Sequence, residues 1–337
     1  MTLAYFDAEQ GDLEKLRKAF PKFRLTVLPD PLREDTAPAA HDAEIVSVFV
    51  KSHVTADVLE QLPKLRMIAA RSTGVDHIDI GGCEKRDVLV TNVPVYGENT
   101  VAEHAFALIL ALSRKIFQSY ERTERMNFDR SGLQGFDLFG KTLGVVGVGN
   151  IGRHAIRIGR GLSMHVVAYD TKPDLHLAAE FGFSYTRTLD ELLGKSDVVT
   201  LHVPYVPSTH HMINKENVQK IKRGALLINT ARGALVDTQA LLWALEEKVL
   251  SGAGLDVLEE ETDTYEEIEL LSKEFPKSKD IATILRNHIL VARDDVIITP
   301  HNAFNSVEAV QRIFDTTVQN VRAFLDGKPV NVVSKKG

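Results

Sequence analysis

The chain of 337 residues contains only one cysteine, Cys83, so it cannot close an intramolecular disulfide or supply a cysteine cluster for zinc. This scarcity favours a reducing compartment, and we interpret Cys83 as a small buried hydrophobe. An excess of basic residues is also missing, since 40 Lys and Arg stand against 46 Asp and Glu and give a net charge of −6. A mildly acidic chain is a poor candidate for a broad nucleic-acid-binding surface.

Long hydrophobic runs and low-complexity stretches are absent as well. The longest apolar run, residues 101–112, carries Glu103 and His104 and is shorter than the ~20 residues that a membrane span requires. The N-terminal residues lack a basic start followed by an apolar stretch, so we expect no signal peptide, no membrane partner and a cytoplasmic protein. Since 44% of the residues are hydrophobic, the chain is expected to fold, and its length suggests two domains at ~150 residues each.

Short apolar runs rich in β-formers alternate with helical segments along most of the chain. The alternation extends to about residue 94, stops in a polar stretch near 127–142, and restarts from there to about residue 299. This pattern predicts an α/β fold with two doubly wound domains, each a parallel sheet covered by helices on both faces.

Two helices are expected at the junctions of this pattern. Residues 99–117 are apolar nearly all round, which predicts a helix buried against another domain or another subunit. Residues 306–327 form an amphipathic segment with Ser306 as N-cap and Gly327 just past the end. We expect this last helix to pack on the first domain, which lacks a closing helix. A further cap is predicted where Thr188 and Glu191 match a capping box.

The sequence VVGVGNIG, residues 145–152, is typical of a dinucleotide-binding loop. Gly147, Gly149 and Gly152 have the G-x-G-x-x-G spacing and lie between an apolar strand and a helical segment. The first glycine permits a tight turn, the second lets the backbone approach a pyrophosphate, and the third allows close packing of helix on strand. Asn150 and Ile151 fill the variable positions and are expected to touch the pyrophosphate through backbone groups.

Asp170 supports this interpretation. It follows the next predicted strand, 18 residues after Gly152, where an acid accepts hydrogen bonds from the adenosine ribose. The carboxylate would repel the extra phosphate of NADP, so the predicted cofactor is NAD. Lys172 lies two residues further on and could soften that preference.

Three ionisable residues follow predicted strands at the edge where open α/β sheets bind ligands. They are Arg232 in INTARGALVD, Glu261 in GLDVLEEE and His301 in ITPHNAF. Hydride transfer to a nicotinamide needs an acid or base at the carbinol oxygen and a cation for an anionic substrate. One histidine, one glutamate and one arginine could supply both, which predicts an oxidoreductase.

These motifs, together with RSTGVDHID and TNVPVYGENTVAEHAFALIL, occur in the order found in the D-isomer-specific 2-hydroxyacid dehydrogenases. The chain resembles this family over nearly its whole length, and NVPVYGEN and LHVPYVPSTHHMIN are most similar to its bacterial D-lactate dehydrogenase branch. The resemblance implies reversible reduction of pyruvate to D-lactate by NADH. Other enzymes of the same framework stay open as alternatives, acting on bulkier 2-oxoacids, glyoxylate or hydroxypyruvate. A non-catalytic NAD-sensing protein, like the C-terminal-binding-protein corepressors, is a second alternative.

The resemblance also assigns catalytic roles. His301 would give a proton to the substrate carbonyl and take it back in oxidation, while Glu261 would hydrogen-bond this imidazole and favour its protonated form. Arg232 would bind the substrate carboxylate and polarise the keto oxygen. In the first domain, Thr73 and Gly74 match a second carboxylate anchor, and Tyr96 matches an aromatic position beside the substrate.

Further cofactor contacts implied by the resemblance are Val203, Pro204, Thr209, Thr230, Ala231, Arg232 and, near the nicotinamide amide, Asp256. The resemblance implies a flavodoxin-like substrate domain formed by residues 1–98 and 300–337. Residues 99–299 would form a Rossmann NAD-binding domain. A homodimer is expected, with the apolar helix at its interface, and no metal is required.

Several residues near these motifs receive plainer interpretations. Glu259 and Glu260 are expected to form a solvated acidic turn, although a register slip would make one of them the catalytic acid instead of Glu261. His210 and His211 are interpreted as polar loop residues with no acid placed beside them. Trp243 is expected in the core or an interface. The role of the 40-residue separation between Glu261 and His301 is not predicted.

Overall fold

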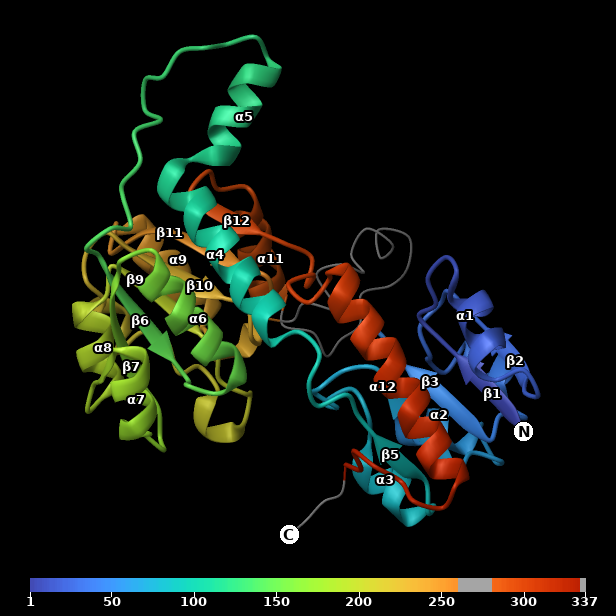
Figure 1. Ribbon diagram of the computed structural model, residues 1–337. Helices are drawn as coiled ribbons and strands as arrows, with labels where there is room; N and C mark the ends of the chain where they lie inside the picture. The colour runs from blue at the N-terminus through green and yellow to red at the C-terminus, as the bar shows by residue number, and fades with distance from the viewer. Residues whose placement is uncertain (260–280, 334–337) are drawn as a thin grey trace. The chain divides into compact units, whose positions relative to one another are not determined.

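A computed structural model describes residues 1–259 and 281–333 of the chain. The chain divides into two compact units, one formed by Met1–Tyr96 with Ser306–Gly337 and the other by Gly97–Asn305. Both are α/β units built on all-parallel sheets (Figure 1), as the alternating sequence pattern predicted.

The first unit contains a sheet of five strands in the order β2-β1-β3-β4-β5. This is the flavodoxin-like order. The strands are β1 (Thr2–Tyr5), β2 (Arg24–Val27), β3 (Ile45–Val48), β4 (Met67–Ala70) and β5 (Leu89–Thr91). The helices are α1 (Asp12–Ala19), α2 (Ala56–Glu60), α3 (Ile80–Lys85) and α12 (Val307–Leu325), with a short 3-10 turn η1 (Ala37–Ala40).

The central strands of this sheet are buried on both faces, which explains their continuous apolar sequences. Val46 and Ile68 join the core on one face. Ile45 and Met67, one residue away in each strand, join the core on the other, where Val321 of α12 covers them. The expected docking of the last helix on the first unit is thus confirmed, and Figure 1 shows α12 alongside these strands.

The second unit contains seven strands in the order β12-β11-β10-β9-β6-β7-β8. Read from β8, this is the Rossmann order extended by one strand. The strands are β6 (Thr142–Val146), β7 (His165–Tyr169), β8 (Ser184–Tyr185), β9 (Val198–Leu201), β10 (Ala225–Asn229), β11 (Leu250–Leu255) and β12 (Val296–Ile298).

The helices of the second unit, with the exception of α5, cover both faces of its sheet. They are α4 (Glu98–Arg114), α5 (Ile116–Glu124), α6 (Asn150–Gly161), α7 (Leu175–Phe181), α8 (Leu189–Lys195), α9 (Thr238–Glu246) and α11 (Ile281–Val291), with 3-10 turns η2 (Pro207–Thr209), η3 (Val218–Lys220) and η4 (Gly233–Leu235). Helices α4 and α6 pack on one face with Phe106 and Ile156, and α8 and α9 pack on the other with Leu192 and Leu241. Trp243 of α9 is 42% exposed, so the core position considered for it is wrong.

The helix predicted over residues 99–117 is interrupted. Lys115 has a left-handed backbone with φ 52° and separates α4 from α5. In a continuous helix the Ser113 carbonyl would accept from the amide of residue 117. Here it accepts from the Phe136 amide at 2.9 Å instead, and this accounts for the break. Beyond it, α5 and the segment leading to β6 stand away from the sheet (Figure 1), and every residue of α5 keeps part of its surface exposed.

The predicted caps are present with one change. Ser306 Oγ accepts the Ala309 amide at 3.1 Å, and Gly327 follows α12 with φ 68°. Thr188 Oγ1 accepts the Glu191 amide at 3.1 Å. The Glu191 carboxylate, however, accepts from the amide of Arg187 rather than from that of Thr188. Its hydrogen bond to Lys195 and that amide bond lower the pKa of Glu191.

The chain passes from the second unit to the first later than residue 300. Residues 300–305 belong to the second unit because the Asp256 carboxylate accepts the amides of Asn302 and Ala303 at 3.0 and 2.9 Å. His301 therefore lies in the same unit as the glycine loop and not in the first. Within residues 1–259 and 281–333, no helix combines the length and apolarity needed to cross a membrane.

Candidate active site

The described residues predicted to bind cofactor or substrate share one topological position. Each follows the carboxyl end of a strand, the edge at which open parallel sheets bind ligands. In the first unit these strands are β4, before Thr73 and Gly74, and β5, before Tyr96. In the second unit they are β6 before Gly147–Gly152, β7 before Asp170, β9 before Val203, Pro204 and Thr209, β10 before Thr230–Arg232, β11 before Asp256 and β12 before His301.

The glycine loop has the geometry that its sequence predicted. Gly147 has φ 91°, and a Cβ atom at Gly152 would lie 2.0 Å from the carbonyl oxygen of Gly147, so neither position accommodates a side chain. At Gly149 a Cβ atom would meet nothing within 4 Å, which leaves open space over the start of α6. The N-terminus of this helix is thus exposed to an anion, as pyrophosphate binding requires. Asn150 is further anchored by a hydrogen bond of 2.9 Å to Glu98.

Asp170 lies beside this loop. One carboxylate oxygen accepts the Val148 amide at 2.8 Å and the other accepts the Lys172 amide at 2.8 Å. These bonds fix the carboxylate next to the loop while leaving lone pairs for further donors. The arrangement suits the hydroxyls of a ribose.

The loop after β9 flanks the glycine loop. A Cβ atom at Gly147 would lie 2.7 Å from Val203 Cγ1, so Val203 packs directly over the turn. Thr209 holds this loop together, because its hydroxyl is within 2.8 Å of the Pro204 carbonyl and 2.9 Å of the Val206 amide. His202 directly follows β9 and hydrogen-bonds Thr200, and burial lowers its pKa to about 4.

The turn after β10 is shaped by Asn229, a residue that sequence reasoning missed. Its buried side chain donates to the Arg232 carbonyl at 2.8 Å and accepts the Ala231 amide at 3.1 Å, which folds Thr230–Arg232 over the strand end. The hydroxyl of Thr230 is buried and has no hydrogen-bond partner among the described residues. With the open space at Gly149 and the exposed helix N-terminus, this orphaned hydroxyl fits a bound dinucleotide.

Asp256 and His301 belong to one network. The Asp256 carboxylate is 1% exposed and accepts from Thr299 Oγ1 at 2.5 Å as well as from the two amides after His301. The His301 amide donates to the carbonyls of Asp256 and Thr299, both at 2.9 Å, and holds His301 at φ 51°. Asp256 thus fixes the loop that carries His301. Sequence reasoning had placed it only near the nicotinamide. His104 Nε2 lies within hydrogen-bond distance, 3.0 Å, of Thr299 Oγ1 in the same network.

Two predictions about polar residues near the site are wrong. Glu259 is not part of a solvated turn, and His211 does have an acid beside it, since His211 Nε2 lies 2.5 Å from Glu259 Oε1. The other carboxylate oxygen accepts from Thr238 Oγ1 at 2.7 Å. Forty-eight residues separate the pair in sequence, so local pattern gave no signal for it. Glu260 and Glu261 lie outside the described residues.

In the first unit, Thr73 and Gly74 lie on a braced loop. Thr73 Oγ1 donates to the Val93 carbonyl at 2.9 Å, and the Gly74 carbonyl accepts from Ser72 Oγ at 2.7 Å. Sequence reasoning missed Arg71, which is 4% exposed and stacks 3.8 Å from the Tyr5 ring while donating to the Phe6 carbonyl. The Tyr96 carbonyl accepts from Arg312 Nε of α12 at 2.5 Å.

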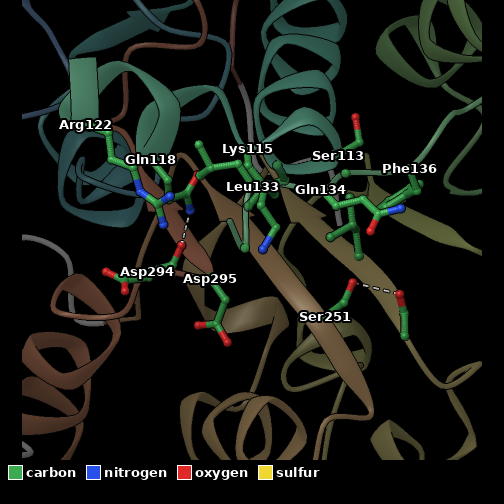
Figure 2. A pocket seen from close by; sticks show the side chains of 15 residues that line it. Ser113, Lys115, Gln118, Arg122, Leu133, Gln134, Phe136, Ser251, Asp294 and Asp295 are labelled. Carbon is green, nitrogen blue, oxygen red and sulfur yellow. Dashed lines mark hydrogen bonds between the residues drawn. The ribbon is translucent and has the colours of Figure 1, made fainter. Parts of the chain in front are cut away.

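A cavity of about 390 Å³ lies elsewhere in the second unit, at the amino ends of β10 and β11 (Figure 2). Gln118 donates to the Asp294 carbonyl there, and Ser251 Oγ donates to the Gly224 carbonyl at 2.7 Å. Arg122 and Ser113 come from α5 and α4. The predicted site residues gather at the opposite ends of the strands, so we do not assign this cavity to catalysis.

The Rossmann-type sheet, the open glycine loop and the fixed Asp170 carboxylate define the second unit as a dinucleotide-binding domain. The chain belongs to the D-isomer specific 2-hydroxyacid dehydrogenases: residues 106–303 match the NAD binding domain of that family. Its cofactor is NAD, and it is an oxidoreductase close to the D-lactate dehydrogenases.

The relatives agree over nearly the whole chain. D-lactate dehydrogenase from Escherichia coli (strain K12) is 36% identical over 326 residues, 95% of this chain and 96% of the relative. Glycerate dehydrogenase from Methylorubrum extorquens is 37% identical and covers 86% of this chain and 85% of its own length. The structure of D-lactate dehydrogenase from Aquifex aeolicus complexed with NAD and lactic acid has a TM-score of 0.84 and 38% identity, covering 97% and 96% of the two chains.

Proposed function

We propose that the chain catalyses the reversible NADH-dependent reduction of pyruvate to D-lactate. The observation that carries the proposal is topological. An arginine and a histidine, Arg232 and His301, follow β10 and β12 at the same edge of the sheet as the glycine loop and Asp170. A cation for a carboxylate and a proton donor for a carbonyl are the two groups that reduction of a 2-oxoacid requires beyond its cofactor.

NAD supplies the hydride chemistry when it is bound. The glycine loop Gly147–Gly152 would hold the pyrophosphate and Asp170 the adenosine ribose, with Val203, Pro204 and Thr209 on one side. Thr230 and Ala231 would lie on the other. Asp256 keeps the loop after β12 in place, and it is also the proposed contact of the nicotinamide amide.

The roles of the protein groups follow from their chemistry. Arg232 binds the substrate carboxylate and polarises the keto oxygen, since its planar guanidinium matches a carboxylate in two parallel hydrogen bonds. His301 gives a proton to the carbonyl oxygen during reduction and removes it during oxidation. For the first unit taken by itself, the proposed substrate contacts are Thr73, Gly74 and Tyr96.

Glu261 is the proposed partner of the His301 imidazole. Glu259 is already held by His211 and Thr238, and this favours Glu261 over Glu259 as the acid that orients the catalytic histidine.

A broader 2-oxoacid reductase is the second candidate, because a glycerate dehydrogenase is as similar in sequence as a D-lactate dehydrogenase. Steady-state NADH oxidation with pyruvate, phenylpyruvate, 2-ketoisocaproate, hydroxypyruvate and glyoxylate separates the two. We expect the highest kcat/KM with pyruvate. A higher kcat/KM with a bulkier acid, hydroxypyruvate or glyoxylate would leave the family chemistry in place and overturn the assignment to lactate.

The proposed assembly is a cytoplasmic homodimer. Ile116, Phe117 and Tyr120 of α5 are each about half exposed, 53%, 48% and 59%. An exposed cluster of large apolar side chains on a projecting helix is typical of a contact between protein surfaces. Such a contact would bury this cluster in a dimer.

A further inference from the structure

His211 and Glu259 form a hydrogen-bonded pair that the proposed chemistry does not use. His211 Nε2 lies 2.5 Å from Glu259 Oε1, and the Glu259 side chain is 14% exposed. The second carboxylate oxygen accepts from the hydroxyl and the amide of Thr238 at 2.7 and 3.3 Å. The Glu259 carbonyl accepts from Asn287 Nδ2 of α11 at 2.7 Å. Glu259 is therefore fixed by the loop after β9, the start of α9 and α11.

His211 is itself held in place. Its backbone is left-handed with φ 48°, and its amide donates to the Ala234 carbonyl at 2.9 Å. Two residues later, the Ile213 amide donates to the Leu235 carbonyl at 3.1 Å. The His211–Ile213 segment thus runs along η4, the turn that directly follows Arg232.

Gly233, the residue after Arg232, lies directly against the backbone of Leu258 and Glu259. A Cβ atom at Gly233 would lie 2.0 Å from the Leu258 carbonyl oxygen and 2.4 Å from the Glu259 nitrogen. Only a glycine allows this approach, and it leaves the two backbones in direct contact. A shift of Glu259 would therefore be transmitted to Arg232 through Gly233.

We propose that His211 and Glu259 are a positioning pair that sets the backbone of Arg232 for the carboxylate of the 2-oxoacid. Neither residue touches the substrate in this account. His211 holds Glu259 against Gly233 on one side of Arg232. On the other side, the Asn229 side chain donates to the Arg232 carbonyl. Small displacements of a group that binds substrate have large kinetic effects, because the geometry of the bound state is exacting. The inference rests on the proposed 2-oxoacid reduction.

The test compares Glu259→Gln, His211→Ala and the double variant with the wild type. We expect the KM for pyruvate to rise roughly tenfold in each single variant, because a partly buried hydrogen bond that holds Glu259 is lost or weakened. The dissociation constant for NADH should stay within about twofold, since the glycine loop and Asp170 are untouched. The double variant should show about the same KM as either single variant, as expected for two residues that act as one unit.

Two further variants separate positioning from general damage. His211→Gln keeps an N–H donor within reach of Glu259 and should restore most of the wild-type KM. His210→Ala is the matched control, because His210 is the stacked neighbour, with ring centroids 3.8 Å apart, and lies in the same loop. We expect its KM to match the wild type.

The positioning role is overturned if the wild type is active and the folded variants Glu259→Gln and His211→Ala have the same KM for pyruvate as the wild type. Additive effects in the double variant also overturn it. If Glu259→Gln does not fold, the more exposed His211→Ala and His211→Gln decide the question alone. A wild type that reduces no 2-oxoacid overturns the proposed function itself, which distinguishes that failure from failure of the pair.

Discussion

His301 is the residue on which the proposed chemistry depends most. Its backbone is left-handed, so replacement by alanine would add strain, whereas asparagine tolerates this conformation. We therefore predict that His301→Asn lowers kcat for pyruvate reduction by about 10²–10⁴-fold through loss of the proton donor. NADH binding, measured by fluorescence titration of the same variant, should be unchanged. A variant that turns over at the wild-type rate would remove His301 from the mechanism.

Asp170 governs the choice of cofactor in this account. Asp170→Asn keeps an acceptor for the Val148 amide and removes the negative charge that, in the proposed function, would face the ribose. We expect the preference for NADH over NADPH, expressed as a ratio of kcat/KM values, to fall about tenfold, the equivalent of ~1.4 kcal/mol. Steady-state assays with both cofactors measure this ratio. If it does not move, discrimination resides elsewhere, and Lys172 becomes the next residue to test.

His202 makes the stability of the fold depend on pH. Burial lowers its pKa from 6.5 to about 4, so the unfolded chain binds a proton in a range where the folded chain does not. The free energy of unfolding therefore decreases as pH falls from about 6.5 towards 4, and the residue has little effect above that range. Between pH 7 and pH 5 we expect a loss of about 2 kcal/mol from this residue.

The prediction for His202 is checked by urea unfolding of the wild type and of His202→Asn at pH 7 and pH 5. The variant has no group that titrates at this position, so its stability should fall less between the two pH values. Equal losses in both proteins would show that His202 titrates normally in the fold.

Single residues differ in how far the sequence reveals them. The glycine loop and Asp170 were predictable because their spacing within one strand-loop-helix-strand unit has a direct physical meaning. The sequence did not reveal the roles of Asn229, Arg71 and the His211–Glu259 pair. Each of these residues acts through contacts that only the folded chain creates. Glu259 was misinterpreted for this reason, as an acid among acids in a turn rather than the partner of a histidine 48 residues earlier.

At the scale of elements, α12 provides a direct test of local capping. Ser306 Oγ accepts the Ala309 amide at the start of this helix. We predict that Ser306→Ala destabilises the protein by about 1 kcal/mol, while Ser306→Asp, which retains an acceptor, stays close to the wild type. Urea unfolding followed by far-ultraviolet circular dichroism gives both values. Equal midpoints for Ser306→Ala and the wild type would show that the cap contributes nothing.

Long elements with strong periodicity were predicted well, and short or interrupted ones were not. Apart from β8, which has only two residues, the strands of both sheets match the apolar patterns of the sequence, and so do α6, α9 and α12. Helix α3 has six residues and α7 has seven, too few turns to show a period. The break at Lys115 was missed because it depends on Phe136, whose amide takes the Ser113 carbonyl from 23 residues away in sequence.

At the scale of the whole molecule, alternation of strands and helices was sufficient to predict two parallel α/β units. The return of the last helix to the first unit followed from the lack of a closing helix there. The transition near residue 300 was placed too early, because no local signal shows that Asp256 binds the amides of Asn302 and Ala303. This contact matters for function, since it keeps His301 in the unit that carries the cofactor loop.

The central claim is that NADH reduces the carbonyl carbon of pyruvate by hydride transfer on this chain. The most direct measurement uses NADH deuterated at both C4 positions, with mass spectrometry and chiral chromatography of the lactate formed. The account predicts D-lactate carrying one deuterium at C2. L-lactate, lactate without deuterium, or no reduction of pyruvate at all would contradict it.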